Sequence, residues 1–308
     1  MGNGEKTSAN TKKGFTHWWT SRAKKVILPG LVGLSLYDLY IIFYAGLLKG
    51  AFSARASAIS FSFFMALFPF LLFILNLIPF INFIDDFQLE FLAFVDSLLP
   101  PETSEFFNDI FYDIAARKRG GLLSIVFLLS IILMANGVNA VFTGFEFSYH
   151  TKKNRSIIRQ YIIAVGISLI LALLLLITVV VWVYLTYLTE DLKMLQVVND
   201  AVVWANLGRY VIFTVMIYLA VAILYYFGTK ESRLSRFFSI GAFFCTIFIL
   251  LNTYLFGLYI ENFSAYNELY GSIGALLILM FYIWINSNIL LLGFELNASL
   301  MKLKRNKK

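Results

Sequence analysis

Six segments of this chain are long and apolar enough to cross a lipid bilayer as helices. A hydrocarbon core about 30 Å thick needs roughly 20 helical residues, and each segment meets that length. Of the 308 residues, 60% are hydrophobic and only 14% are charged, whereas about a quarter are charged in soluble domains. The sequence therefore predicts an all-α integral membrane protein. Its six-helix membrane domain covers 54–301, with spans over 54–80, 121–145, 157–187, 208–227, 237–260 and 270–301.

A shorter hydrophobic stretch, 31–48, precedes the first span and allows two interpretations: a seventh span, or a helix lying in the interface. We favour an interfacial amphipathic elbow helix over 31–50, because a seventh span would place the basic tail, 1–30, outside. A narrow polar stripe at 100° per residue supports this choice; it contains Ser35, Asp38, Ala45 and Lys49. No signal peptide is expected, since the first 25 residues are polar.

Basic residues are distributed unevenly along the chain. The segments expected inside, counted with Arg55, hold 20 of the 25 Lys and Arg, whereas the outside loops hold 13 of the 18 acidic residues. The asymmetry predicts that both termini, including the basic tail 302–308, are cytoplasmic. It also explains the net charge of +7 without nucleic acid, because cytoplasmic lysines and arginines face anionic lipid headgroups.

The first outside loop, 81–120, is the one sizeable region expected off the membrane, and we expect it to form a short helical extracytoplasmic cap. Two of its stretches have apolar residues at helical spacing. Asp109 and Asp113 lie one turn apart, but a solvated helix face explains them better than a metal pair. The single cysteine, Cys245, excludes an intrachain disulfide and a sulfur-based metal site.

Polar side chains inside the spans are the candidates for a cavity or for interhelical contacts, since such groups are costly in lipid and need protein or water beside them. Asn136, Asn139 and Thr143 share one face, with Gly137 and Gly144 beside them, and that face should meet another helix closely. The third span has almost no such groups and is expected to face lipid. The candidates are Arg55, Asn76, Asn136, Asn139, Asn252, Asn286, Asn288, Glu295 and Asn297.

Glu295 is the ionisable member of the last span and lies seven residues before Lys302, about 10 Å along a helix, so it is near the cytoplasmic headgroups. It either binds a proton, an ion or a headgroup, or anchors the bundle by pairing with Arg55 or a basic loop residue. We favour the anchor, because carboxylates near an interface commonly pair. The asparagines allow the same two interpretations.

The first span with its entrance, the Asn139 region, and the segment 270–300 resemble the YihY/BrkB family of bacterial inner-membrane proteins. The marks are Tyr270, Gly271 and Ser272 at the start of a long apolar helix and, at its end, Gly293, Glu295, Leu296, Asn297 and Ala298. The similarity covers about 30–301. It implies six helices in a bacterial cytoplasmic membrane and brings no established activity.

Members of this family have carried the label ribonuclease BN, which we regard as a misassignment, and others are loosely associated with serum resistance and with envelope or lipid transport. This chain has two histidines, His17 and His150, both near membrane boundaries, and no convergent carboxylates for catalytic metals. It also lacks a nucleophile and base at recognisable spacing. We therefore expect no enzyme, no catalytic residue, no cofactor and no metal.

Two functions remain. In the first, the chain transports or translocates a lipid or other amphiphile in envelope maintenance, with polar stripes lining a cavity. In the second, it is a non-transporting envelope scaffold that binds a partner membrane protein through the outer cap or the basic tails. Small-residue faces could serve contacts within one chain or between chains, which leaves the oligomeric state open.

Overall fold

The computed structural model describes residues 52–77, 87–98, 123–148, 155–194, 199–232, 236–262 and 272–306, together with Ser35 and Tyr37. Six helices in these ranges are long and apolar enough to cross a membrane, which confirms the predicted number of spans. They are α3 (Phe52–Leu77), α6 (Leu123–Glu146), α7 (Ile157–Met194), α8 (Asn199–Gly228), α9 (Ile240–Asn262) and α11 (Ser272–Asn306). The seventh helix, α4 (Phe87–Leu98), has 12 residues.

The predicted basic tail, nearly all of the interfacial helix over 31–50, and most of the cap lie outside the described residues. From the cap, the structure describes α4, the first of the two stretches with helical spacing. Its apolar face is buried, with Phe91 and Phe94 almost completely covered. Phe94 packs against Trp182 of α7 with ring centroids 5.5 Å apart, so α4 is anchored to that span.

Several helices run past the limits expected from hydropathy. α7 continues to Met194, α8 starts at Asn199 rather than near 208, and α11 includes the basic residues up to Asn306. The reason is that falling hydropathy marks where a segment leaves the lipid, whereas the backbone stays helical until a residue breaks it. In α3 the helix also continues through Pro69.

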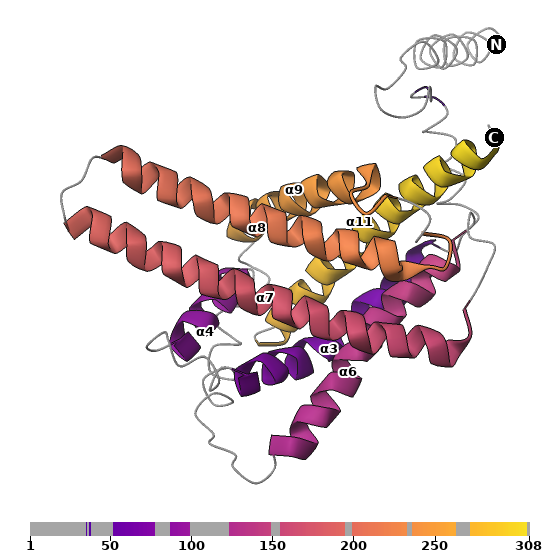
Figure 1. Ribbon diagram of the computed structural model, residues 1–308, viewed down its shortest axis with the longest axis horizontal. Helices are drawn as coiled ribbons and strands as arrows, with labels where there is room; N and C mark the ends of the chain where they lie inside the picture. Colours follow the sequence, from indigo (N-terminus) through magenta and orange to yellow (C-terminus); the bar gives the residue numbers. More distant parts are fainter. Residues whose placement is uncertain are drawn as a thin grey trace, which may run out of the picture.

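Successive spans alternate in direction. α3, α7 and α9 begin, and α6, α8 and α11 end, at one end of the bundle, called the Arg55 end below because Arg55 lies in the first turn of α3. Figure 1 shows α7 and α8 running side by side, while α6 meets α7 at the Arg55 end and diverges from it toward the opposite end.

The six spans form a closed ring. α3 packs on α6, α6 on α7, α7 on α8, α8 on α9, α9 on α11, and α11 back on α3. A close approach of α6 to another helix is confirmed at its two glycines: a Cβ on Gly137 would lie 2.9 Å from the Ala66 Cβ, and one on Gly144 would lie 2.7 Å from the Ile59 Cδ1. Both neighbours belong to α3, so small residues let these two helices approach.

The expectation that the third span faces lipid holds for one side of α7 only. Ile158, Ile162 and Ile177 are exposed on it, whereas Val179 and Val183 are completely buried. A helix without polar residues gives no sequence signal that separates its lipid face from its protein face, since both are apolar. α7 therefore belongs to the ring as much as the polar spans do.

Candidate functional site

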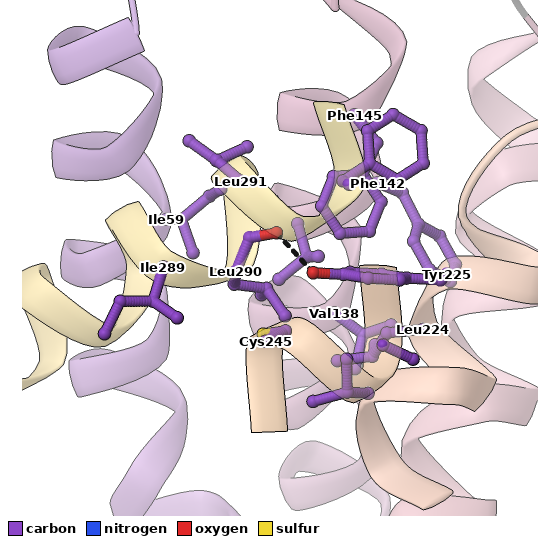
Figure 2. Close-up of a cluster of buried hydrophobic side chains, with 14 of the residues drawn as sticks. Ile59, Val138, Phe142, Phe145, Leu224, Tyr225, Cys245, Ile289, Leu290 and Leu291 are labelled. Carbon is purple, nitrogen blue, oxygen red and sulfur yellow. Dashed lines mark hydrogen bonds between the residues drawn. The ribbon is translucent and has the colours of Figure 1, made fainter. Parts of the chain in front are cut away.

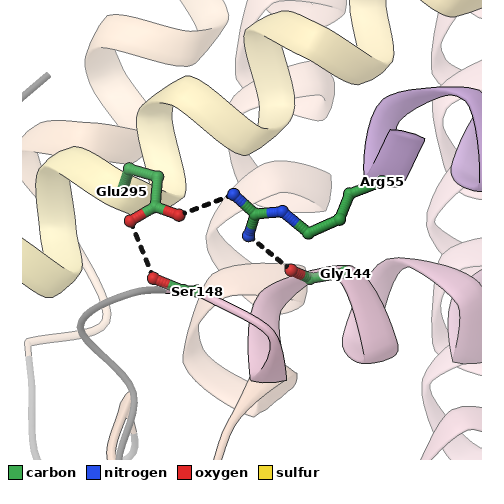
Figure 3. Close-up of polar contacts among 4 residues, drawn as sticks. All are labelled: Arg55, Gly144, Ser148 and Glu295. Carbon is green, nitrogen blue, oxygen red and sulfur yellow. Dashed lines mark hydrogen bonds and ion pairs between the residues drawn. The ribbon is translucent and has the colours of Figure 1, made fainter. Parts of the chain in front are cut away.

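A buried ion pair joins three helices at the Arg55 end. Arg55 of α3 donates from Nη2 to Oε1 of Glu295 in α11 over 2.9 Å, and the two residues are only 8% and 3% exposed. The second carboxylate oxygen, Oε2, accepts from the Ser148 hydroxyl at 2.7 Å, just after α6. Figure 3 shows the guanidinium lying between α11 and the end of α6. The geometry is that of the interhelical anchor.

The C-terminal end of α6 supplies the remaining partner of Arg55. The Ser148 N–H bonds to the Phe145 carbonyl instead of the Gly144 carbonyl. Gly144 therefore offers one of the carbonyls that a helix end leaves unpaired, and Arg55 Nη1 donates to it over 2.9 Å. The negative end of the α6 dipole also favours a cation here. Arg55 Nε is buried and has no hydrogen-bond partner among the described residues.

A second contact ties α9 to α11 close by. Gly241 and Gly293 bring the two backbones together; a Cβ on Gly293 would lie 2.8 Å from the Gly241 carbonyl oxygen. Asn297 Oδ1 accepts from the Gly241 N–H at 2.9 Å, and Asn297 Nδ2 donates to the Ser239 Oγ at 2.7 Å. Ser239 Oγ also accepts from the Ala242 N–H, so it caps the start of α9.

Tyr225 of α8 completes this closely packed region. Its hydroxyl donates to the Leu290 carbonyl of α11 at 2.7 Å, the contact drawn in Figure 2. Its ring meets Phe145 and Phe294, which stack on each other with centroids 4.1 Å apart. All three aromatic side chains are buried. The Arg55 end is thus held by polar bonds and by aromatic packing together.

Two of the candidate asparagines link α6 to α7. Gln160 Nε2 donates to Asn139 Oδ1 at 3.0 Å and to Thr143 Oγ1 at 2.9 Å. One turn earlier on α6, Asn136 Oδ1 accepts from the Tyr161 hydroxyl at 3.1 Å. These contacts lie between helices, and neither asparagine lines the apolar cavity described below.

The other asparagines differ in what they contact. Asn252 Nδ2 of α9 donates to Asn286 Oδ1 of α11 at 3.3 Å, and Asn286 Nδ2 donates to the Tyr282 carbonyl of its own helix. Asn288 donates to the Trp284 carbonyl, again within α11. Asn76 lies in the last turn of α3, and its side chain is outside the described part.

Residues of the six spans line an apolar cavity of about 420 Å³ between the Arg55 end and the opposite end. Of the residues that the sequence singled out as candidates, Asn286 is the one that lines it. The hydroxyls of Ser168 and Ser287 face it as well, but each donates to a carbonyl of its own helix. Every span contributes to the wall, for example Phe63, Gly137, Leu171, Ala220, Ile249 and Leu290.

Sequence reasoning missed this cavity and the partners Gln160, Ser148 and Tyr225. Gln160 gave a usable signal, since an amide near the start of an apolar helix needs a partner in the neighbouring one. The cavity gave none, because its wall has the same residue types as a packed interior. Within the described ranges, no three His, Cys, Asp or Glu side chains come close enough to hold a metal ion.

Comparison with known proteins places the chain in a family. The family model described as "Virulence factor BrkB" matches residues 43–308. A relative in Bacillus subtilis (strain 168), named "Putative ribonuclease-like protein YfkH", is 26% identical over 260 residues; the match covers 82% of this chain and 91% of the relative. No solved structure matches the chain.

Proposed function

The chain belongs to the BrkB family of multi-pass membrane proteins, and we propose that it transports or translocates a lipid or other amphiphile in envelope maintenance. One observation carries this proposal: the apolar cavity of about 420 Å³ that all six spans line. Small-molecule sites have volumes of about 300–1,000 Å³, so the cavity is large enough for part of a lipid.

The chemistry of the wall indicates which part of an amphiphile the cavity takes. It is formed mainly by hydrocarbon side chains, and its serine hydroxyls are already paired within their helices. An uncompensated polar group would cost several kcal/mol there, whereas an alkyl chain finds surroundings much like lipid. We therefore assign the cavity to the hydrocarbon chain and place the headgroup outside it.

The same proposal includes the setting and the partners. The charge asymmetry supports both termini in the cytoplasm of a bacterium, with the inner membrane as the location and anionic headgroups at the cytoplasmic face as partners. We propose no nucleic-acid substrate and no enzymatic activity; the ribonuclease-like name belongs to the Bacillus subtilis relative.

Filling the cavity tests the proposal. Ala220 lines it, so Ala220→Phe should occupy part of its volume, while Ala58→Phe puts the same ring on an exposed face of α3 and serves as the matched control. The wild type and the control should retain lipid through purification from native membranes, measured by native mass spectrometry, and Ala220→Phe should lose most of it.

Retention of the same lipid by Ala220→Phe, with unchanged stoichiometry, would refute the cavity as the binding site. The scaffold alternative predicts instead a wild type that carries no specific lipid and whose cellular phenotype survives cavity filling. Thermal unfolding of all three proteins separates lost binding from lost folding. An intact Ala220→Phe without lipid supports the cavity as the lipid-binding site that transport requires.

A further inference from the structure

A second cation lies at the opposite end of the bundle. Arg209 is the third residue of the apolar span Leu207–Gly228 and is partly buried. Its Nη2 donates to the Thr189 Oγ1 of α7 at 3.2 Å, and its guanidinium carbon lies 5.7 Å from the centroid of the Trp182 ring. Among the described residues no carboxylate pairs with it.

The contacts of Arg209 leave donor capacity unused. A guanidinium has five N–H donors, and within the described ranges this one has a single hydroxyl acceptor, while its buried Nε has no partner there. Arginines inside membrane spans almost always pair, because an unpaired buried charge is costly. The Trp182 ring and Thr189 hold the guanidinium in place and satisfy little of its hydrogen bonding, so the arrangement fits an anion that arrives with the ligand.

The position of Arg209 relative to the cavity suggests what that anion belongs to. Met216 lines the cavity and lies seven residues from Arg209 on α8, two turns or about 10 Å along the same helix face. On α7, Leu175 lines the cavity and lies seven residues from Trp182. Both helices thus carry the cation site about two turns beyond the cavity wall. In an anionic lipid, the charged headgroup is likewise displaced from the hydrocarbon chain to which it is attached.

We propose that Arg209, with Trp182 and Thr189, binds the phosphate of a lipid whose hydrocarbon chain occupies the cavity. This rests on the proposed function and adds to it the class of headgroup, a phosphate ester, and the end of the bundle that holds it. That end is the one expected to face away from the cytoplasm, so the site is separate from the basic cytoplasmic segments. Arginine suits this role because its planar fork matches phosphate oxygens.

The experiment compares a phospholipid with the diacylglycerol that lacks its phosphate-containing headgroup, and with phosphate by itself. The full-length protein in a non-ionic detergent is titrated with dioleoyl phosphatidylglycerol, with dioleoylglycerol, and with inorganic phosphate, and binding is followed by native mass spectrometry. Charge-assisted hydrogen bonds of about 1.5–3 kcal/mol correspond to a preference of about 10- to 100-fold for the phospholipid. Arg209→Gln should bind both lipids about equally. Arg159→Gln, an exposed arginine at the Arg55 end, should keep the preference.

Arg209→Lys keeps the positive charge and should retain a weaker preference for the phospholipid. This variant serves as the test if Arg209→Gln folds poorly. An undiminished preference in a folded Arg209→Gln overturns the proposal, and so does displacement of the phospholipid by equimolar inorganic phosphate. Equal binding of both lipids by the wild type, lost in Ala220→Phe, would overturn the phosphate site and leave the chain-binding cavity intact. Absence of any lipid binding by the wild type would remove both.

Discussion

Glu295→Gln removes the negative charge of the buried ion pair while keeping the shape of the side chain. Arg55 and Glu295 are 8% and 3% exposed, so water cannot replace the lost carboxylate. Breaking a buried pair by removing one partner costs about 3–5 kcal/mol, because the other charge remains buried and uncompensated. We expect the free energy of unfolding of Glu295→Gln to fall by that amount.

Hydrogen bonding alone explains a smaller part of this loss. The carboxylate accepts from Arg55 and Ser148 on separate oxygens, whereas an amide has one acceptor oxygen. The Ser148 hydroxyl can rotate and accept from the amide N–H₂, so that contact survives. Arg55→Met should also be costly, since it leaves Glu295 unpaired and removes the donor to the Gly144 carbonyl.

A double-mutant cycle tests the reasoning. Unfolding is measured in mixed micelles of increasing sodium dodecyl sulfate for Arg55→Met, Glu295→Met and the double variant, with Glu90→Gln of α4 as a control for loss of a partly exposed carboxylate. The double variant should lose less stability than either single variant, because two apolar side chains replace the pair. If the stability losses of the two single variants add up to that of the double variant within about 0.5 kcal/mol, the two residues are not coupled.

Two further predictions concern α9. Gly241→Ala should lower stability by about 1–3 kcal/mol, because its Cβ would meet Asn297 and the Gly293 carbonyl. The Cβ of Gly257→Ala meets open space, so this variant should raise stability by about 0.5–1 kcal/mol through better helix propensity. The same mixed-micelle titration measures both variants, and equal effects would contradict the close crossing of α9 and α11. Asn297→Ala should lower the free energy of unfolding by about 1–3 kcal/mol, because Asn297 Oδ1 accepts from the Gly241 N–H. The rate of hydrogen exchange at the Gly241 amide should rise in this variant. An unchanged exchange rate would argue against the bond.

The number of spans could be predicted from the sequence because one constraint acts on the whole chain: each crossing needs roughly 20 apolar residues. The ends of α7 and α11 could not, since Glu190 to Met194 and Lys302 to Asn306 are rich in charged residues yet helical. Hydropathy describes the surroundings of a residue, and helix propensity describes its backbone. In the middle of a span both properties indicate a helix, whereas at the ends of a span hydropathy falls while the backbone remains helical.

Polar positions in the spans were predictable, and their partners only in part. For Glu295 the sequence offered Arg55 or a basic loop residue as partner, and the structure pairs it with Arg55. Asn139 had several possible neighbours, and its bond to Gln160 depends on the rotation of α6 against α7, which periodicity does not fix. The cavity was beyond sequence reasoning, because it arises from how six apolar faces fail to fill the centre of a ring.

Along α11, the stabilising contacts and the cavity occupy different stretches. Gly293, Glu295 and Asn297 hold α11 against α3, α6 and α9, whereas Tyr282, Asn286 and Leu290 face the cavity. Helices in lipid gain little from hydrophobic burial against one another, so close packing and polar bonds decide where a bundle is tight. A bundle held firmly at the Arg55 end can therefore keep an unfilled centre. It follows that Glu295→Gln should change stability far more than lipid binding, whereas Ala220→Phe should change lipid binding far more than stability.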